Sequence, residues 1–169
     1  VKVICVIALL FIVIRLFCPT WTPSIKGENS ISELGKVDIN GVSLEVMIRG
    51  NDKDNPVLIF VHGGPYCSEI PYVRKYQKNL ENDFTIVHYD QRGSGKSYKF
   101  GEDYSAVTVS THTGDLIALT EYVKEYLKKE HVILIGHSYG TYISALAVEQ
   151  RPDLYQAYVG IGQMSDTVE

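Results

Sequence analysis

The fold assignment depends on one stretch, His131-Val-Ile-Leu-Ile-Gly-His-Ser-Tyr-Gly-Thr141. It opens with an apolar, mostly β-branched run at residues 132–135, which is typical of a buried strand. Gly136-His-Ser-Tyr-Gly140 follows, and apolar residues then recur at helical spacing. A G-x-S-x-G sequence between a strand and a helix is the pattern of a nucleophile elbow, a sharp turn that exposes the serine hydroxyl. The alternative interpretation is a glycine-rich turn whose Ser138 has no chemical role.

Composition excludes several classes of protein. The chain has 169 residues, 45% of them hydrophobic, and a net charge of −4. These values favour one globular domain, or part of one, over a disordered chain, and we expect no nucleic-acid partner. Cys5, Cys18 and Cys67 form neither a disulfide framework nor a metal-ligand spacing, so we expect no metal and no cofactor.

Strand and helix patterns alternate along most of the chain. Asn40-Gly41 separates two alternating runs, which is a strong hairpin signal. We expect strands at residues 36–39, 42–48, 57–61, 84–89, 132–135 and 157–161, and helices at 69–82, at 108–129 and after the elbow. This order predicts an α/β fold with a mostly parallel sheet and crossover helices, in which the functional loops follow the C-terminal ends of the strands.

The first glycine-rich loop is His62-Gly-Gly-Pro65, directly after the strand predicted at 57–61. Two glycines at this point let backbone N–H groups approach a ligand closely. We expect His62 to bond the loop backbone, because the catalytic base of a sheet with such an elbow comes after the serine in the chain. A plain glycine turn is the alternative.

The second glycine-rich loop covers residues 90–97, Asp-Gln-Arg-Gly-Ser-Gly-Lys-Ser. Its end is similar to a phosphate-binding loop, but Asp90 stands where that motif requires glycine, and its charge would repel phosphate. We therefore expect the loop to brace the active site, with Asp90 and Arg92 pairing with each other and bonding backbone groups. His112 and Asp115, near the start of the helix predicted at 108–129, are interpreted as capping or loop contacts.

These motifs resemble those of α/β-hydrolases of the prolyl iminopeptidase type, in particular His62-Gly-Gly-Pro65, the Asp-Gln-Arg-Gly-x-Gly part of residues 90–97, and the elbow. The resemblance covers residues 36–169. It implies an enzyme that cleaves an N-terminal residue, often proline, through a serine acyl-enzyme, acting on a small peptide or ester. It makes Ser138 the nucleophile. The backbone amides of Gly64 and Tyr139 are then the oxyanion-hole donors, each typically worth about 3 kcal/mol.

The chain departs from the family pattern in two places. Tyr66 stands where the family usually has another glycine, and no histidine follows Ser138. The triad aspartate and histidine are therefore expected beyond residue 169, after a cap and two more strands. Neither Asp153 nor Asp166 is assigned to the triad, and this N-terminal part alone is expected to be inactive.

Two alternatives to the aminopeptidase remain open. One is a carboxylesterase of the same fold, because the sheet supports many chemistries. The other is a non-catalytic protein of this fold that binds a small molecule. Epoxide hydrolases and dehalogenases use a carboxylate nucleophile at the elbow, and Ser138 argues against that chemistry.

The N-terminus is uninterrupted apolar sequence from Val3 to Ile14. We expect residues 1–19 to be an uncleaved membrane anchor rather than a cleaved signal peptide, because no small-residue cleavage site follows. The predicted organisation is this segment, a linker at 20–35 and the N-terminal part of a hydrolase domain at 36–169. The expected location is the membrane, with the domain outside the cytoplasm, or secretion of the domain if the segment is cleaved.

Overall fold

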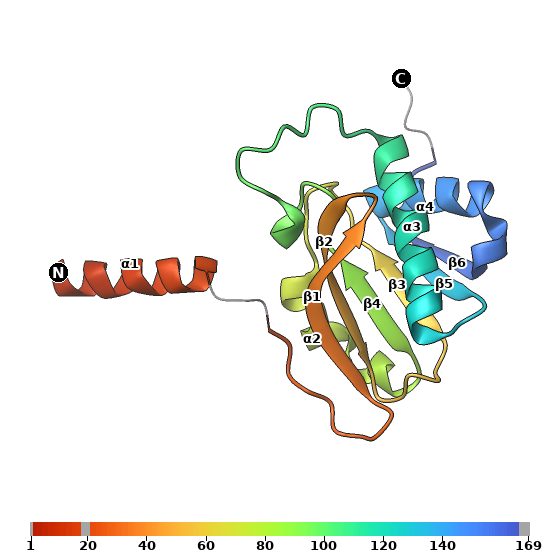
Figure 1. Ribbon diagram of the computed structural model, residues 1–169, viewed down its shortest axis with the longest axis horizontal. Coiled ribbons are helices and arrows are strands. Elements are labelled where there is room, and N and C mark those ends of the chain that lie inside the picture. The colour runs from red at the N-terminus through yellow and green to blue at the C-terminus, as the bar shows by residue number, and fades with distance from the viewer. Residues whose placement is uncertain (1, 18–20, 166–169) are drawn as a thin grey trace.

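The computed structural model describes residues 2–17 and 21–165. Within these residues, six strands form one sheet (Figure 1). Their order across the sheet is β1-β2-β4-β3-β5-β6. The strands are β1 (Ile31–Ile39), β2 (Val42–Gly50), β3 (Val57–Val61), β4 (Thr85–Tyr89), β5 (Val132–His137) and β6 (Tyr155–Ile161). The helices are α1 (Lys2–Phe17), α2 (Ile70–Gln77), α3 (Val109–Leu127) and α4 (Tyr139–Gln150), with short 3₁₀ turns η1 (Lys78–Asn82), η2 (Gly95–Ser97) and η3 (Pro152–Leu154).

The mostly parallel sheet with crossover helices is confirmed. β4, β3, β5 and β6 run parallel to one another, whereas β2 pairs antiparallel with both β1 and β4. Parallel neighbours end at the same edge, so the loops after β4, β3 and β5 come out side by side. This order brings the three sequence motifs together.

The predicted hairpin is present and begins earlier than expected. Asn40 and Gly41 both have positive φ, 51° and 74°, as a two-residue type I′ turn requires. β1 starts at Ile31, inside the region predicted as a linker, because it pairs with β2 as far back as Gly50. Pairing with a buried neighbour outweighs the weak strand propensity of this polar segment.

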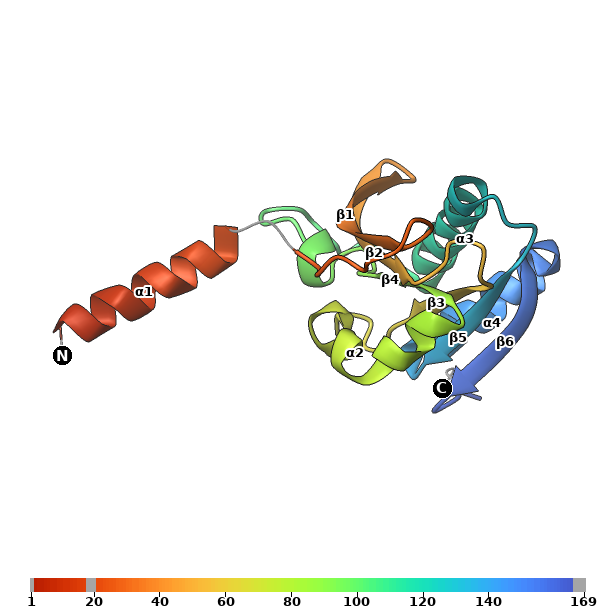
Figure 2. The same ribbon diagram turned by 90° about the horizontal axis from the view of Figure 1, so that it is seen from below.

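Two apolar layers enclose the sheet. α3 and α4 cover one face, and α2 lies on the other (Figure 2). Alternation along β3 shows the division, since Ile59 belongs to the larger core while Leu58 and Phe60 belong to a smaller cluster on the opposite face. β3 is buried over its whole length, which fixes the loop that follows it.

Of the two long helices predicted before the elbow, one is present over nearly its whole predicted range and the other is shorter than predicted. The helix predicted at 108–129 is α3, which Thr108 caps through a reciprocal capping box with Thr111. The helix predicted at 69–82 changes to a 3₁₀ turn after Gln77. Of its predicted apolar face, Tyr72 and Tyr76 are 50% and 71% exposed.

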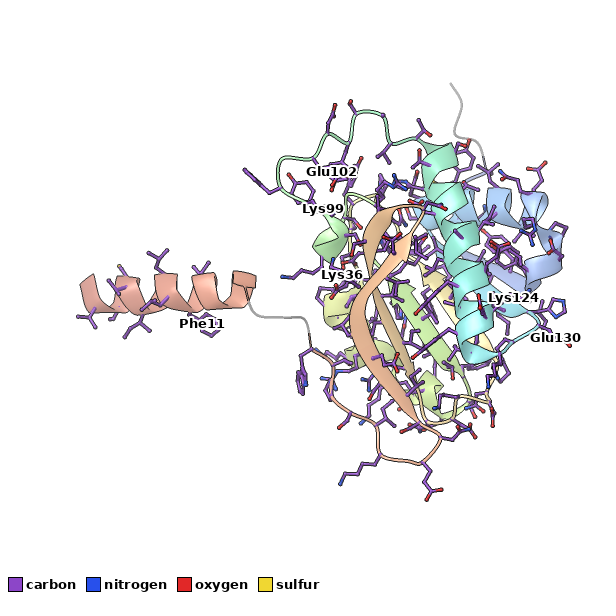
Figure 3. The ribbon with its side chains drawn as sticks, viewed as in Figure 1. Phe11, Lys36, Lys99, Glu102, Lys124 and Glu130 are labelled. Carbon is purple, nitrogen blue, oxygen red and sulfur yellow. The ribbon has the colours of Figure 1, made fainter. Side chains whose placement is uncertain are left out.

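The apolar N-terminal segment forms α1, a helix of 16 residues in which the side chains of residues 3–12 are exposed, Phe11 among them (Figure 3). At 1.5 Å per residue such a helix covers about 24 Å, less than the roughly 30 Å of a bilayer core. In the described part of the chain, no helix is both long and apolar enough to cross a membrane. The predicted membrane anchor, transmembrane helix and membrane location are therefore wrong. Residues 18–20, at the end of that segment, lie outside the described residues.

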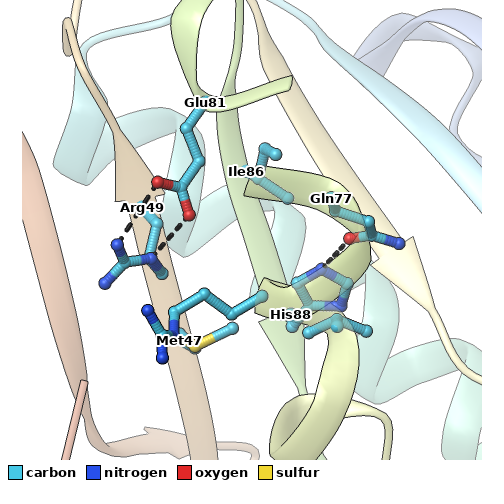
Figure 4. A pocket seen from close by; sticks show the side chains of 8 residues that line it. Met47, Arg49, Gln77, Glu81, Ile86 and His88 are labelled. Atoms are coloured by element: carbon cyan, nitrogen blue, oxygen red, sulfur yellow. Dashed lines mark hydrogen bonds and ion pairs between the residues drawn. The ribbon is translucent and has the colours of Figure 1, made fainter. Parts of the chain in front are cut away.

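A buried ion pair holds the segment before β1 against the sheet (Figure 4). Arg49 Nε lies 2.7 Å from Glu81 Oε1, and Arg49 Nη1 donates to Pro23 O at 2.7 Å. The pair borders a small pocket between β2, β4 and α2, where His88 Nε2 lies 2.7 Å from Gln77 Oε1. Burial lowers the pKa of His88 to about 3.

Candidate active site

Three loops meet at the carboxyl edge of β4, β3 and β5. We call residues 62–65 the glycine loop, residues 90–97 the bracing loop and residues 136–140 the elbow. Each lies at the end of a strand, as the sequence predicts. Any chemistry of this sheet is expected at that edge.

The elbow holds its serine in a strained backbone conformation. Ser138 has φ 51° and ψ −120°, a positive-φ conformation that costs energy for a non-glycine residue, and its side chain is exposed. Both flanking glycines are required. A Cβ on Gly140 would lie 2.0 Å from Val61 O, and one on Gly136 would lie 2.7 Å from Thr141 Cα. The turn therefore lifts Ser138 out of the sheet where α4 begins.

The glycine loop approaches the elbow closely. A Cβ on Gly63 would lie 3.0 Å from Ser138 Cβ, so only glycine leaves this space free. Gly64 has φ 120°, another conformation that favours glycine. Among the described residues, the N–H groups of Gly64 and Tyr139 donate to no protein acceptor. Both predicted oxyanion-hole residues thus belong to segments beside Ser138.

His62 ties the glycine loop to the bracing loop, as predicted. Its Nδ1 lies 2.7 Å from Gly63 O, and its Nε2 accepts from the Gln91 N–H at 3.0 Å. Gln91 Nε2 in turn donates to His62 O at 2.7 Å. Burial lowers the pKa of His62, which keeps the ring neutral and Nε2 an acceptor.

The predicted pair of Asp90 and Arg92 is wrong. Arg92 instead forms a two-pronged ion pair with Asp115 of α3, at 2.9 Å and 2.8 Å. Asp90 Oδ2 accepts from the Lys96 N–H at 2.7 Å and so closes the bracing loop on itself. Arg92 contacts a residue 23 positions further along the chain, and a pattern within one loop cannot predict such a contact. Asp115, expected as a capping or loop contact, anchors the loop to α3.

His112 makes loop contacts, one of the two roles that the sequence predicts for it, and these reach both the bracing loop and the elbow. Its Nδ1 lies 3.0 Å from the Tyr139 hydroxyl, and its Nε2 lies 3.2 Å from Arg92 O. A carbonyl oxygen only accepts, so Nε2 carries the proton and Nδ1 accepts from Tyr139. Burial lowers the pKa of His112, which favours this neutral form. His112 therefore connects the bracing loop to the residue after Ser138.

A second side-chain pair beside the elbow has no signal in the sequence. His137 Nδ1 lies 2.8 Å from Glu69 Oε1, although the two residues are 68 positions apart. The pair is not completed into a triad, because no hydrogen bond joins His137 to the Ser138 hydroxyl in the described residues. The same residues contain no cluster of three acidic, histidine or cysteine side chains that could hold a metal ion.

The fold and these loops define a class of protein. The chain belongs to the alpha/beta hydrolase fold family, whose pattern matches residues 56–169. It is 40% identical over 137 residues to the probable aminopeptidase YbaC of Bacillus subtilis, a match that covers 81% of this chain and 43% of that protein.

Solved structures of similar fold include other hydrolase-family proteins. The proline iminopeptidase-related protein of Thermus thermophilus superimposes with a TM-score of 0.63 at 28% identity, covering 75% of this chain and 43% of that one. Epoxide hydrolase VrEH1 of Vigna radiata gives 0.62 at 26% identity, covering 79% and 40%. The resemblance to hydrolases of the prolyl iminopeptidase type is confirmed, and the chain spans less than half the length of these three proteins.

Proposed function

We propose that the protein is a serine hydrolase of the aminopeptidase kind, similar to proline iminopeptidases, and that Ser138 is its nucleophile. One observation carries the proposal: Ser138 stands exposed at φ 51° between β5 and α4, against the glycine loop. A non-glycine residue keeps such a strained conformation only where the surrounding structure enforces it, and such residues cluster at active sites.

The reaction follows acyl transfer through a covalent intermediate. Ser138 Oγ attacks the carbonyl carbon of the residue to be released, and its proton passes to a general base. The N–H groups of Gly64 and Tyr139 stabilise the tetrahedral oxyanion. Collapse expels the amine, which takes up a proton, and water then hydrolyses the ester on Ser138. Within the described residues, no hydrogen bond joins His62, His88, His112 or His137 to the Ser138 hydroxyl, and none of them is assigned as the base.

The similar proteins all support a hydrolase, but their names indicate different reactions. The names of the Bacillus and Thermus proteins point to peptide bonds, whereas VrEH1 is an epoxide hydrolase. Ser138 favours the first group, because an alkyl-enzyme intermediate of epoxide opening requires a carboxylate at the elbow. A carboxylesterase uses the same serine geometry and differs only in the substrate that the rest of the site accepts.

Hydrolysis by the full-length gene product tests the proposal. We expect release of arylamine from L-prolyl or L-alanyl arylamides to exceed hydrolysis of short acyl esters, and Ser138→Ala to abolish it. Faster hydrolysis of esters would assign a carboxylesterase. Binding of these compounds without hydrolysis or labelling of Ser138 would assign the non-catalytic alternative.

A further inference from the structure

The outermost strand β1 has a free edge with a groove along it (Figure 1). The groove has a volume of about 430 Å³, which is large enough for several side chains of a ligand. Four strand spacings, about 19 Å, separate β1 from β5, so the groove is distinct from the elbow. Its lining consists of residues 32–37 of β1, Trp21 and Thr22 before that strand, Val46 and Ile48 of β2, and Tyr122 of α3.

The free edge of β1 presents backbone groups at every second residue. The two-residue turn Asn40-Gly41 joins Ile39 to Val42, and this closing pair of such a hairpin exchanges both backbone hydrogen bonds. Counting back from Ile39, the N–H and C=O groups that point away from β2 within the groove belong to Ser32, Leu34 and Lys36. In residues 2–17 and 21–165 these groups make no backbone hydrogen bond outside the β1–β2 ladder. An extended peptide can therefore pair with this edge as an added strand.

A gap in the side-chain layer lies above Gly35. A Cβ at this residue would meet nothing within 4 Å, so the space beside it is open. The buried side chains of Val46 and Ile48, which pair with Gly35 and Glu33, form the floor of the groove. A strand laid against β1 would place one side chain opposite Gly35, and an aromatic or large apolar group there would cover the edge glycine.

Glu33 gives the same face of β1 a negative charge. The Tyr126 hydroxyl donates to its carboxylate, lying 3.0 Å and 2.9 Å from the two oxygens, and the Tyr126 ring stacks on Tyr122. In the described part of the chain, no lysine or arginine forms an ion pair with Glu33. Lys36 points to the other face of the strand, where its ammonium lies 3.4 Å from Glu45 Oε2. A basic residue of a partner, placed opposite Glu33, would complete the pairing of charges.

A second copy of β1 does not supply this basic residue. Two antiparallel β1 strands related by a twofold axis keep each face of the sheet on its own side, so odd-numbered residues stand opposite odd-numbered ones. Lys36, the basic residue of β1, would then never stand opposite Glu33. The charge pattern therefore favours a different chain as the partner.

We propose that the free edge of β1 binds an extended peptide of another protein as an antiparallel added strand. The peptide carries a large apolar side chain opposite Gly35 and a lysine or arginine opposite Glu33. Backbone hydrogen bonds to Leu34 and Lys36 supply affinity, and the two side chains select the sequence. The proposal does not depend on the function proposed for Ser138.

Calorimetry with short peptides tests the proposal on the full-length gene product. The ligand is acetyl-Thr-Lys-Thr-Phe-Thr-Lys-Thr-amide, which can place its phenylalanine opposite Gly35 and a lysine opposite Glu33. The comparison peptide has glutamate in place of both lysines. We expect the lysine peptide to bind about tenfold more tightly, and Glu33→Gln to reduce that ratio to about threefold or less. The matched control is Glu149→Gln, which changes the net charge equally on α4, beside β5 and β6, and should leave the ratio unchanged.

Two further changes test the geometry of the groove. Gly35→Leu fills the open space without a clash at its Cβ, so it should preserve the fold and weaken binding of the lysine peptide by about fivefold or more. A lysine peptide that is methylated on the backbone nitrogens of its two inner threonines cannot donate to β1, and it should bind about tenfold or more weakly. Thermal unfolding midpoints establish that each variant is folded.

The results that would overturn the proposal are distinct. Equal binding of the lysine and glutamate peptides, equal effects of Glu33→Gln and Glu149→Gln, or full affinity for Gly35→Leu would mean that the groove is not the binding site. Full affinity of the methylated peptide would mean that the strand edge is not used. Absence of binding by every peptide would also contradict the proposal, and a dimer in sedimentation that Gly35→Leu dissociates would then identify a second copy as the occupant.

Discussion

The bracing loop and the elbow reach the same edge of the sheet but are built in opposite ways. The bracing loop buries four of its polar side chains, Asp90, Gln91, Ser94 and Ser97. Its closing hydrogen bonds include Ser97 Oγ to Asp90 O at 2.7 Å. The elbow leaves His137 and Ser138 exposed and holds Ser138 at φ 51°.

The contrast shows how the fold separates support from chemistry. A strained residue keeps its geometry only when its surroundings are rigid. The rigid surroundings here include the bracing loop, which is fastened to α3 through Arg92 and Asp115 and to the elbow through His112 and Tyr139. The elbow then presents the side chain of Ser138 to solvent.

The largest expected effect is on activity at the elbow. Ser138→Ala in the full-length gene product should lower kcat for arylamide hydrolysis by about 10⁴-fold or more, because covalent catalysis is lost. Its stability should change little, since the side chain is exposed. Residual hydrolysis above one tenth of the parent rate would show that another residue is the nucleophile.

The largest effect on stability is expected from Gly140→Ala. The added Cβ would meet Val61 O at 2.0 Å, a contact with backbone that cannot move aside easily. We expect a loss of about 3 kcal/mol in the free energy of unfolding, measured with urea. Gly114→Ala is the matched control: its Cβ meets nothing within 4 Å inside α3, so it should stabilise by about 0.5–1 kcal/mol. Equal effects of the two variants would show that the turn is not tightly packed.

Asp115→Asn should weaken the bracing loop by a smaller amount. The substitution replaces the buried carboxylate of Asp115 by a neutral amide. The Arg92 guanidinium then keeps a hydrogen-bonding partner but loses its negatively charged one. Because Arg92 is 21% exposed, we expect a loss of about 2 kcal/mol rather than the full value of a buried pair. Asp83→Asn, an exposed change, is the control. No loss would mean that the loop is held by its backbone alone.

Acid should destabilise the protein through buried histidines, with His88 contributing about 2 kcal/mol at pH 5. The pKa of His88 is lowered by burial to about 3, against an ordinary value of 6.5. Between these values the unfolded chain binds more protons than the folded one, so stability falls as the pH drops below 6.5. His88→Gln should flatten the dependence between pH 6.5 and 5 by that amount. The exposed change His131→Gln should leave it unaltered, and an unchanged slope in His88→Gln would contradict the account.

Much of the fold could be predicted because its signals are local. The Asn40-Gly41 turn, the apolar run of β3 and the capped pattern of α3 each lie within one element. The boundary at Ile31 was missed because β1 is stabilised by its partner strand and not by its own composition. The length of α1 mattered more than its apolar composition for the membrane prediction, which is wrong.

The site could be predicted in part for the same reason. The elbow and the glycine loop are contiguous in sequence, so Ser138 and Gly64 stand out. The contacts of His112 with Tyr139 and of Glu69 with His137 join residues 27 and 68 positions apart. Such pairs depend on the strand order β4-β3-β5, which no local pattern reports.

Labelling of the serine tests the central claim most directly. The full-length gene product is treated with a fluorophosphonate, and the modified peptide is identified by mass spectrometry. The account predicts one adduct, on Ser138, that is absent from Ser138→Ala and prevented by a competing arylamide. An enzyme that hydrolyses arylamides while Ser138 remains unmodified would contradict it.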